Sequence, residues 1–249
     1  MLPKIKNLEF GNTCKVIAEL GTLHHHNPDG LMAATRQCFD AGADMVKVQF
    51  IRPQYAWWAH PKAKMRYYEL DETFGPRHWA DYLNDANMRN AGPVFGSIFD
   101  SITLHELMDH LPVVKLAFKV NMMPELWMRL SEEILPCIMS TNDTIPDNAY
   151  WPLKRTDRWL FQYVQPSYPL DVAKVRLPLF GRYSSLYEGL SYHGKDMRVV
   201  AGAVALGAKT VEMHVKGEDA QGHDMDFALT MKELEVMVTM IRKQEARGL

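Results

Sequence analysis

The stretch Ala41-Gly-Ala-Asp-Met-Val-Lys-Val-Gln-Phe50 predicts how this chain folds. Its first half places a glycine just past a helix, where a left-handed backbone is needed, and its second half is a short apolar strand. A similar helix-to-strand joint is the Leu-Gly-Ala turn at 206–208. Short β-branched runs that alternate with helical periodicity are typical of a parallel sheet wound with crossover helices. We therefore expect an α/β protein.

Eight such runs can be counted in the 249 residues. Helices are expected between them, including a short one around 104–109 and a final one over 231–247. Eight strands with intervening helices favour a closed (β/α)₈ TIM barrel, a fold that commonly reaches this length as one domain. We thus expect a single barrel over residues 1–249, with strands near 15–19, 44–50, 93–98, 112–117, 134–140, 159–164, 185–191 and 209–215.

The composition is that of a water-soluble globular protein. Hydrophobic residues make up 47% and charged residues 23% of the chain, and no apolar run approaches the roughly 20 residues that span a bilayer. No secretory signal pattern precedes Lys15, so a cytoplasmic location is expected. The formal net charge of −2, without a clustered basic stripe, argues against a nucleic-acid partner.

The cysteines do not form a recognisable metal or disulfide pattern. Cys14, Cys38 and Cys137 are odd in number and far apart, with no CxxC spacing. We interpret them as reduced, mostly buried thiols.

Polar residues end nearly every predicted strand. In a TIM barrel the active site lies at the C-terminal ends of the strands, so these side chains are expected to converge on one cavity. They are Glu19, Lys47, Gln49, Ser97, Lys115, Ser140, Tyr168, Ser191, His193, Glu212 and His214.

Two of these residues are lysines inside apolar runs. Burying Lys47 or Lys115 costs solvation energy unless an anion meets it. One interpretation is a structural ion pair with Glu19 or Glu212. The other is a phosphate site, in which the lysines supply charge and serine hydroxyls supply directional hydrogen bonds.

Two histidines end adjacent strands. His193 and His214 would lie on one rim, at a separation that a divalent ion could bridge, with positions left for water and substrate. Hydrogen-bonded histidines or a proton shuttle are the alternatives. Asp224 is a candidate to support this pair or to hold substrate. The run at 24–26 is also all histidine, but three consecutive side chains cannot face one ion in an ordinary loop.

The longest predicted strand-to-helix loop runs from Ile51 to about Pro76. It contains Trp57, Trp58, Tyr67 and Tyr68 with several basic residues. Long loops of this kind commonly serve as lids or binding surfaces, so we expect a lid or an interface here.

The order of these segments resembles the sialic acid (N-acetylneuraminate) synthase family, including its legionaminic and pseudaminic acid synthase relatives. The resemblance covers nearly the whole chain, and it depends on the order and spacing of segments that are individually weak. They are Ile17-Ala-Glu-Leu-Gly21, residues 41–49, Ile138-Met-Ser-Thr141, Ser167-Tyr-Pro169, Gly189-Leu-Ser-Tyr-His193, residues 203–208, Val211-Glu-Met-His214 and Gly222-His-Asp224.

The resemblance implies a condensation of phosphoenolpyruvate with an amino sugar at a divalent metal, Mn²⁺ or Mg²⁺, with Co²⁺ as a further option. Glu19 is the acid/base candidate near the aldehyde, and His193 and His214 match the metal ligands. Positions that match the family's phosphoenolpyruvate site are Lys47, Ser97, Lys115, Ser140 and Ser191, and positions that face the acceptor sugar are Glu19, Gln49, Tyr168 and Asp224.

The chain also departs from the family pattern. Phe118 stands where a phosphate-binding serine is usual, with Lys119 beside it as a possible source of charge. Tyr192 replaces an aspartate that would support a metal-bound histidine. The family's C-terminal antifreeze-like domain, which contributes an arginine to the partner's sugar site, has no counterpart after the last predicted barrel helix.

Three functional hypotheses follow. The first is a synthase making a nonulosonic-acid-like 2-keto acid and phosphate, as a homo-oligomer or with a separate chain that completes the sugar site. The second is a metal-dependent aldolase or isomerase acting on a sugar phosphate. The third is a catalytically silent barrel serving as scaffold or regulatory subunit, which phosphate release from phosphoenolpyruvate would exclude.

Overall fold

Eight parallel strands close into a barrel. The computed structural model describes residues 4–5, 9–11, 13–22, 28–57, 59–144, 157–181, 185–218 and 220–248. Neighbouring strands pair in chain order, and β1 also pairs with β8, which closes the sheet. The predicted (β/α)₈ architecture is confirmed. The strands are β1 (Lys15–Gly21), β2 (Met45–Phe50), β3 (Val94–Ile98), β4 (Val114–Leu116), β5 (Cys137–Thr141), β6 (Trp159–Val164), β7 (Gly189–Tyr192) and β8 (Thr210–Lys216).

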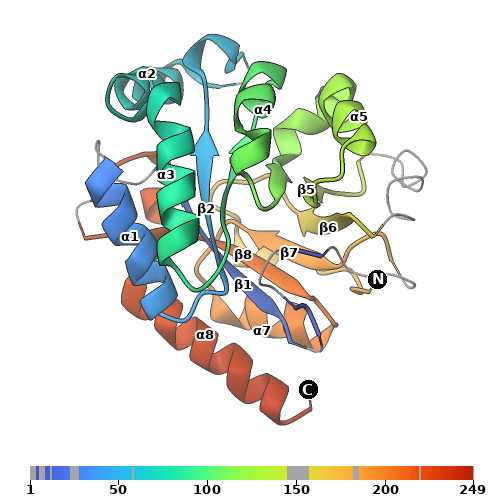
Figure 1. Cartoon of the computed structure of the whole chain (residues 1–249). Coiled ribbons are helices and arrows are strands. Elements are labelled where there is room, and N and C mark those ends of the chain that lie inside the picture. The colour runs from blue at the N-terminus through green and yellow to red at the C-terminus, as the bar shows by residue number, and fades with distance from the viewer. Residues whose placement is uncertain are drawn as a thin grey trace.

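Helices surround this barrel (Figure 1). Between α1 and the strands the core is apolar, and α1 packs beside α3 and α8. A short strand, β9 (Leu229–Thr230), pairs with the end of β8 just before α8. The α-helices are α1 (Pro28–Asp40), α2 (Pro61–Phe74), α3 (Pro76–Arg89), α4 (Ser101–Leu107), α5 (Pro124–Glu132), α7 (Met197–Ala205) and α8 (Met231–Ala246). The 3₁₀ turns are η1 (Pro53–Tyr55), η2 (Met108–His110), η3 (Phe118–Met122), η5 (Val172–Lys174) and η6 (His223–Asp226).

Helix boundaries follow local capping. Thr230 and Glu233 form a reciprocal capping box at the start of α8, as predicted for a helix from Met231. The helix expected around 104–109 begins earlier, because the Asp100 carboxylate accepts the backbone N–H of Thr103 at 2.7 Å. That cap fixes the start of α4 at Ser101.

The prediction of a long loop over 51–76 was wrong. Most of this segment is the helix α2, which begins at Pro61 after His60, whose ring accepts the backbone N–H of Lys62. Proline is favoured in the first turn because its missing N–H has no intrahelical partner there. The aromatic residues at 67 and 68 therefore lie on a helix, while Trp58 lies outside the described residues.

The seventh strand begins later than predicted. The segment expected to pair from residue 185 instead turns there, with the Ser185 hydroxyl accepting the Tyr187 N–H at 2.8 Å. Pairing begins at Gly189. A serine that bonds its own neighbouring backbone competes with the sheet ladder, which explains the difference.

All three cysteines are buried free thiols, as expected. Burial raises the pKa of Cys14 to about 12, and it raises the pKa of Cys38 and Cys137 further. No helix in the described part of the chain is both long and apolar enough to cross a membrane.

Candidate active site

A cavity of about 420 Å³ opens at the C-terminal ends of the strands. Successive inward-facing positions of a barrel strand are two residues apart, so one strand delivers several side chains to it. In β8, Glu212 and His214 both line the cavity. Nine residues predicted for the site line it: Lys47, Gln49, Lys115, Ser140, Tyr168, Ser191, His193, His214 and Asp224.

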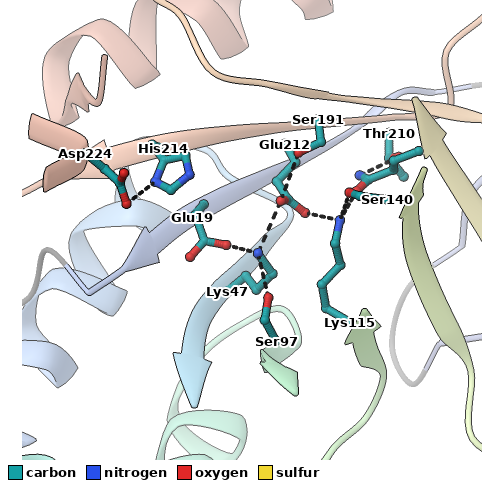
Figure 2. A network of polar contacts seen from close by, with 11 residues as sticks. Glu19, Lys47, Ser97, Lys115, Ser140, Ser191, Thr210, Glu212, His214 and Asp224 are labelled. Atoms are coloured by element: carbon teal, nitrogen blue, oxygen red, sulfur yellow. Dashed lines mark hydrogen bonds and ion pairs between the residues drawn. The ribbon is translucent and has the colours of Figure 1, made fainter. Parts of the chain in front are cut away.

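Lys47 and Lys115, with Glu212 between them, form the floor of the cavity. Glu19 and Ser97, the two predicted site residues that do not line the cavity, lie against Lys47. Lys47 Nζ donates to Ser97 Oγ at 2.9 Å and forms ion pairs with Glu19 and with Glu212 Oε1, the latter at 3.2 Å (Figure 2). Glu19 and Ser97 are fully buried and do not line the cavity. The acid/base role of Glu19 stays a prediction, and its carboxylate is held on the Lys47 ammonium.

Gly21 makes room for that carboxylate. Its φ is +54°, a left-handed value that favours glycine. A Cβ at this position would lie 3.0 Å from Glu19 Oε1. The glycine in the Ile17–Gly21 segment thus permits both the turn and the approach of the acid.

Lys115 forms the second half of the floor. Its Nζ donates to Ser140 Oγ at 2.8 Å, to Glu212 Oε2 at 2.8 Å and to Gln162 Oε1. Glu212 therefore bridges the two lysines, one carboxylate oxygen to each (Figure 2). The ion pairs that the sequence suggested are present, and the same two lysines line the cavity, as a phosphate site requires.

Burial and charge shift the pKa values of the floor residues. Burial lowers the pKa of Lys47 to about 8, with Glu212 opposing the shift, and it lowers the pKa of Lys115 likewise. Burial alone would raise the pKa of Glu212, but the two ammonium groups hold it below its ordinary value. At pH 7 Lys47 is therefore mostly charged and Glu212 is ionised.

The two predicted metal ligands lie side by side. The ring centroids of His193 and His214 are 5.4 Å apart, and the Nδ1 atom of each ring is buried without a hydrogen-bond partner. Burial lowers the pKa of His193 to about 3 and that of His214 well below its ordinary value. Both rings are therefore neutral at pH 7, with bare nitrogens of the kind that bind a divalent ion.

Asp224 lies beside this pair. Its Oδ2 is 3.7 Å from His214 Nδ1 (Figure 2). Asp224 therefore places a carboxylate near the imidazoles. The sequence had suggested that such a carboxylate is lost where Tyr192, a buried residue, replaces the family's aspartate. Within the described ranges no three His, Cys, Asp or Glu side chains group as a metal site, and the assignment of His193 and His214 as metal ligands stays a prediction.

The outer wall of the cavity is largely aromatic. Tyr67 of α2, Phe99, Phe118 and Tyr168 line it, and the Tyr168 ring lies 4.3 Å from the His193 ring. Lys119 also lines the wall, with its Nζ 6.0 Å from the centre of the Tyr168 ring. The position that is serine in the resembling family thus adds apolar surface here.

Part of the predicted lid segment reaches the site. His60, Lys62, Ala63 and Tyr67 face the cavity, whereas Trp57 and Tyr68 are exposed. The buried Arg66 contacts the carbonyl of Gln221 at 3.5 Å, which ties α2 to the loop after β8.

Comparisons with known proteins identify the family of this chain. A model of the NeuB family matches residues 35–248. The chain belongs to the NeuB family. It is 23% identical over 266 residues to pseudaminic acid synthase of Campylobacter jejuni, covering 98% of this chain and 77% of the relative. It is 25% identical over 258 residues to human N-acetylneuraminate-9-phosphate synthase, covering 93% and 70%.

A solved structure supports the same fold. N-acetylneuraminic acid synthetase of Leptospira borgpetersenii matches with a TM-score of 0.83 and 20% identity, over 96% of this chain and 86% of that one. The predicted resemblance is confirmed, and this member of the NeuB family is related to enzymes named as synthases.

Sequence reasoning missed several residues of the site. Glu212 was recognised at a strand end and as an ion-pair partner, but not as the bridge between the lysines. Gln162 escaped notice, although it is the one amide in the apolar run Trp159–Val164. Tyr67 and Lys119 approach from outside the strands; the sequence placed Tyr67 only in the lid segment and Lys119 only as a possible source of charge beside Phe118, and both line the cavity. The histidines at 24–26 lie outside the described residues.

Proposed function

We propose that the chain condenses phosphoenolpyruvate with an amino sugar or a related aldehyde, giving a nonulosonic-acid-like 2-keto acid and phosphate in a metal-dependent reaction. One observation carries the proposal. A floor with two buried lysines and hydroxyl groups adjoins two neutral imidazoles within a single cavity. An anion and a metal ion could therefore bind next to each other in this cavity.

The lysines supply the anion site in this proposal. Lys47 and Lys115 would contact the phosphate and carboxylate of phosphoenolpyruvate, and Ser140 and Ser191 line the same cavity and would donate hydroxyl hydrogen bonds. Ser191 Oγ lies 3.3 Å from Glu212 Oε1. Glu19 and Glu212 already contact these lysines, so the anion would compete with carboxylates in place.

His193 and His214 would hold the divalent ion, Mn²⁺ or Mg²⁺, or Co²⁺. When bound, such an ion polarises the acceptor's carbonyl or activates the water that attacks C2. The buried, unpartnered Nδ1 atoms and the low pKa values of both rings support this assignment, because no proton has to leave before an ion binds.

The proposed reaction forms one carbon–carbon bond and releases phosphate. C3 of phosphoenolpyruvate bonds to the acceptor's carbonyl carbon, and the carbonyl oxygen takes a proton and becomes a hydroxyl group. Water adds at C2, and loss of phosphate leaves the 2-keto group. Gln49, Tyr168 and Asp224 would orient the acceptor, while the barrel rim holds both reactants in register.

The test is turnover by the purified chain. Phosphoenolpyruvate, Mn²⁺ and a panel of amino sugars are incubated with the protein, and phosphate and 2-keto acid are measured together. Equal amounts of both products with at least one acceptor are expected. Sugar-phosphate cleavage without phosphoenolpyruvate would favour the aldolase alternative. Absence of both binding and turnover for phosphoenolpyruvate would favour the silent barrel.

A further inference from the structure

Gln162 lies beneath the cavity and touches Lys115 without lining the cavity itself. The residue is fully buried in β6. An ammonium group only donates hydrogen bonds, so the amide must present Oε1 to Lys115. Its Nε2 then points the other way and donates to Thr210 Oγ1 at 3.1 Å. The amide orientation is therefore fixed at both ends.

This contact crosses a strand. Gln162 of β6 pairs with Gly189 of β7, and Gly189 pairs with Thr210 of β8. A Cβ on Gly189 would lie 1.9 Å from Thr210 Oγ1 and 3.2 Å from Gln162 Cγ. Gln162 and Thr210 can meet only because the residue between them has no side chain.

The two lysines of the floor differ in their partners. Lys47 contacts two carboxylates, Glu19 and Glu212, and one hydroxyl. Lys115 contacts one carboxylate, one hydroxyl and the neutral amide of Gln162. Each of the three N–H donors of Lys115 thus has an acceptor, and only one of these acceptors, Glu212, is a carboxylate. Neighbouring carboxylates therefore offset the charge of Lys115 less than they offset the charge of Lys47.

We infer that Gln162 is a positioning residue for anion binding, which holds the Lys115 ammonium at the floor of the cavity without adding a second carboxylate to it. The inference rests on the proposed function for the identity of the anion, phosphoenolpyruvate. The Gln162–Thr210 contact, made possible by Gly189, holds the amide in place.

The first experiment is calorimetric titration of phosphoenolpyruvate, with Mn²⁺, into the wild type, Gln162→Glu and Gln162→Met. A second carboxylate on Lys115 is expected to weaken binding about tenfold, and loss of the amide about threefold. Gln37→Glu, an exposed amide-to-acid change on α1, is the matched control and should bind like the wild type. In turnover, the KM for phosphoenolpyruvate should rise while kcat stays within about threefold.

Binding by folded Gln162→Glu within about twofold of wild type would overturn the inference. If neither Gln162 variant folds, Thr210→Val decides instead, since it frees the amide and keeps the shape of the side chain. It should weaken binding about twofold to threefold, and unchanged affinity would again overturn the inference.

Failure of the proposed function can be distinguished from failure of the inference about Gln162. If the wild-type chain binds no phosphoenolpyruvate, that function fails, and a crystal structure of Gln162→Met, or of Thr210→Val where the Met variant does not fold, decides the positioning role. Displacement of Lys115 Nζ from Ser140 Oγ, its 2.8 Å partner, is expected. An unmoved ammonium would contradict the role of Gln162.

Discussion

The floor and the outer wall of the cavity are built by different means. Lys47, Lys115 and Glu212 come from the interior of strands, are buried, and hold each other in place through charged contacts. Tyr67, Phe118 and Lys119 come from α2 and η3, outside the barrel sheet. In the proposed reaction, the floor fixed by barrel register would hold the small anion. The wall built from connecting segments would face the acceptor.

His214→Ala tests where the two regions meet. Loss of one of the two proposed metal ligands should reduce metal-dependent turnover at least about 100-fold, because the proposed metal site depends on both imidazoles. The rim residue supports little of the core, so thermal unfolding should change little. His105→Ala, at an exposed position on α4, is the control. Full, metal-requiring activity in the His214 variant would refute the ligand assignment.

Lys115→Met tests the floor alone. Removing one partner of a buried, hydrogen-bonded charge pair should weaken phosphoenolpyruvate binding by about 100-fold, measured by calorimetry. The change also leaves Glu212 with one lysine, so circular dichroism must show that the variant is folded. Lys174→Met, on the exposed turn η5, should bind normally. Equal binding by both variants would remove Lys115 from the anion site.

Tyr67→Ala tests the wall. Loss of this ring should raise the KM for the acceptor about tenfold and leave the affinity for phosphoenolpyruvate unchanged. Its neighbour Tyr68 is exposed, so Tyr68→Ala is a close control. A change in phosphoenolpyruvate affinity alone would show that α2 belongs functionally to the floor and would break the comparison.

The pH dependence of binding is the smallest expected effect. The pKa of Lys47 is lowered to about 8, so its charge is present at pH 7 and is lost as the pH rises through 8. Phosphoenolpyruvate affinity should therefore fall about fivefold between pH 7.5 and 9. The same titration of Lys47→Met should show weaker binding without this slope. An equal slope in both proteins would show that a group other than Lys47 causes the pH dependence.

Lys47 also affects folding stability in a defined direction. Its folded pKa lies below the unfolded value of 10.5, so between about pH 8 and 10.5 the unfolded chain binds more protons. The contribution of this residue to stability therefore improves as pH rises through that range. Raising the pH through this range is thus expected to weaken anion binding and to improve the contribution of Lys47 to stability.

Much of the barrel and of its floor could be predicted from the sequence. Apolar runs of strand length, alternating with helices, gave eight strands, and polar residues at their ends gave nine of the residues that line the cavity. These features are local, because strand periodicity decides which side chains face inward and parallel pairing brings strand ends to one rim. The metal ligands remain a prediction that the geometry of His193 and His214 supports.

The tertiary structure alone decided which groups touch. Glu212 bridges two lysines, Gln162 reaches Thr210 across Gly189, and Tyr67 enters the cavity from a helix where the sequence suggested a loop. These relations join residues far apart in the chain, and they depend on barrel closure and strand register. The sequence by itself determined the fold class and the residue types of the site. Closure and register decided the pairing of its charges, since a contact between distant strands leaves no local pattern.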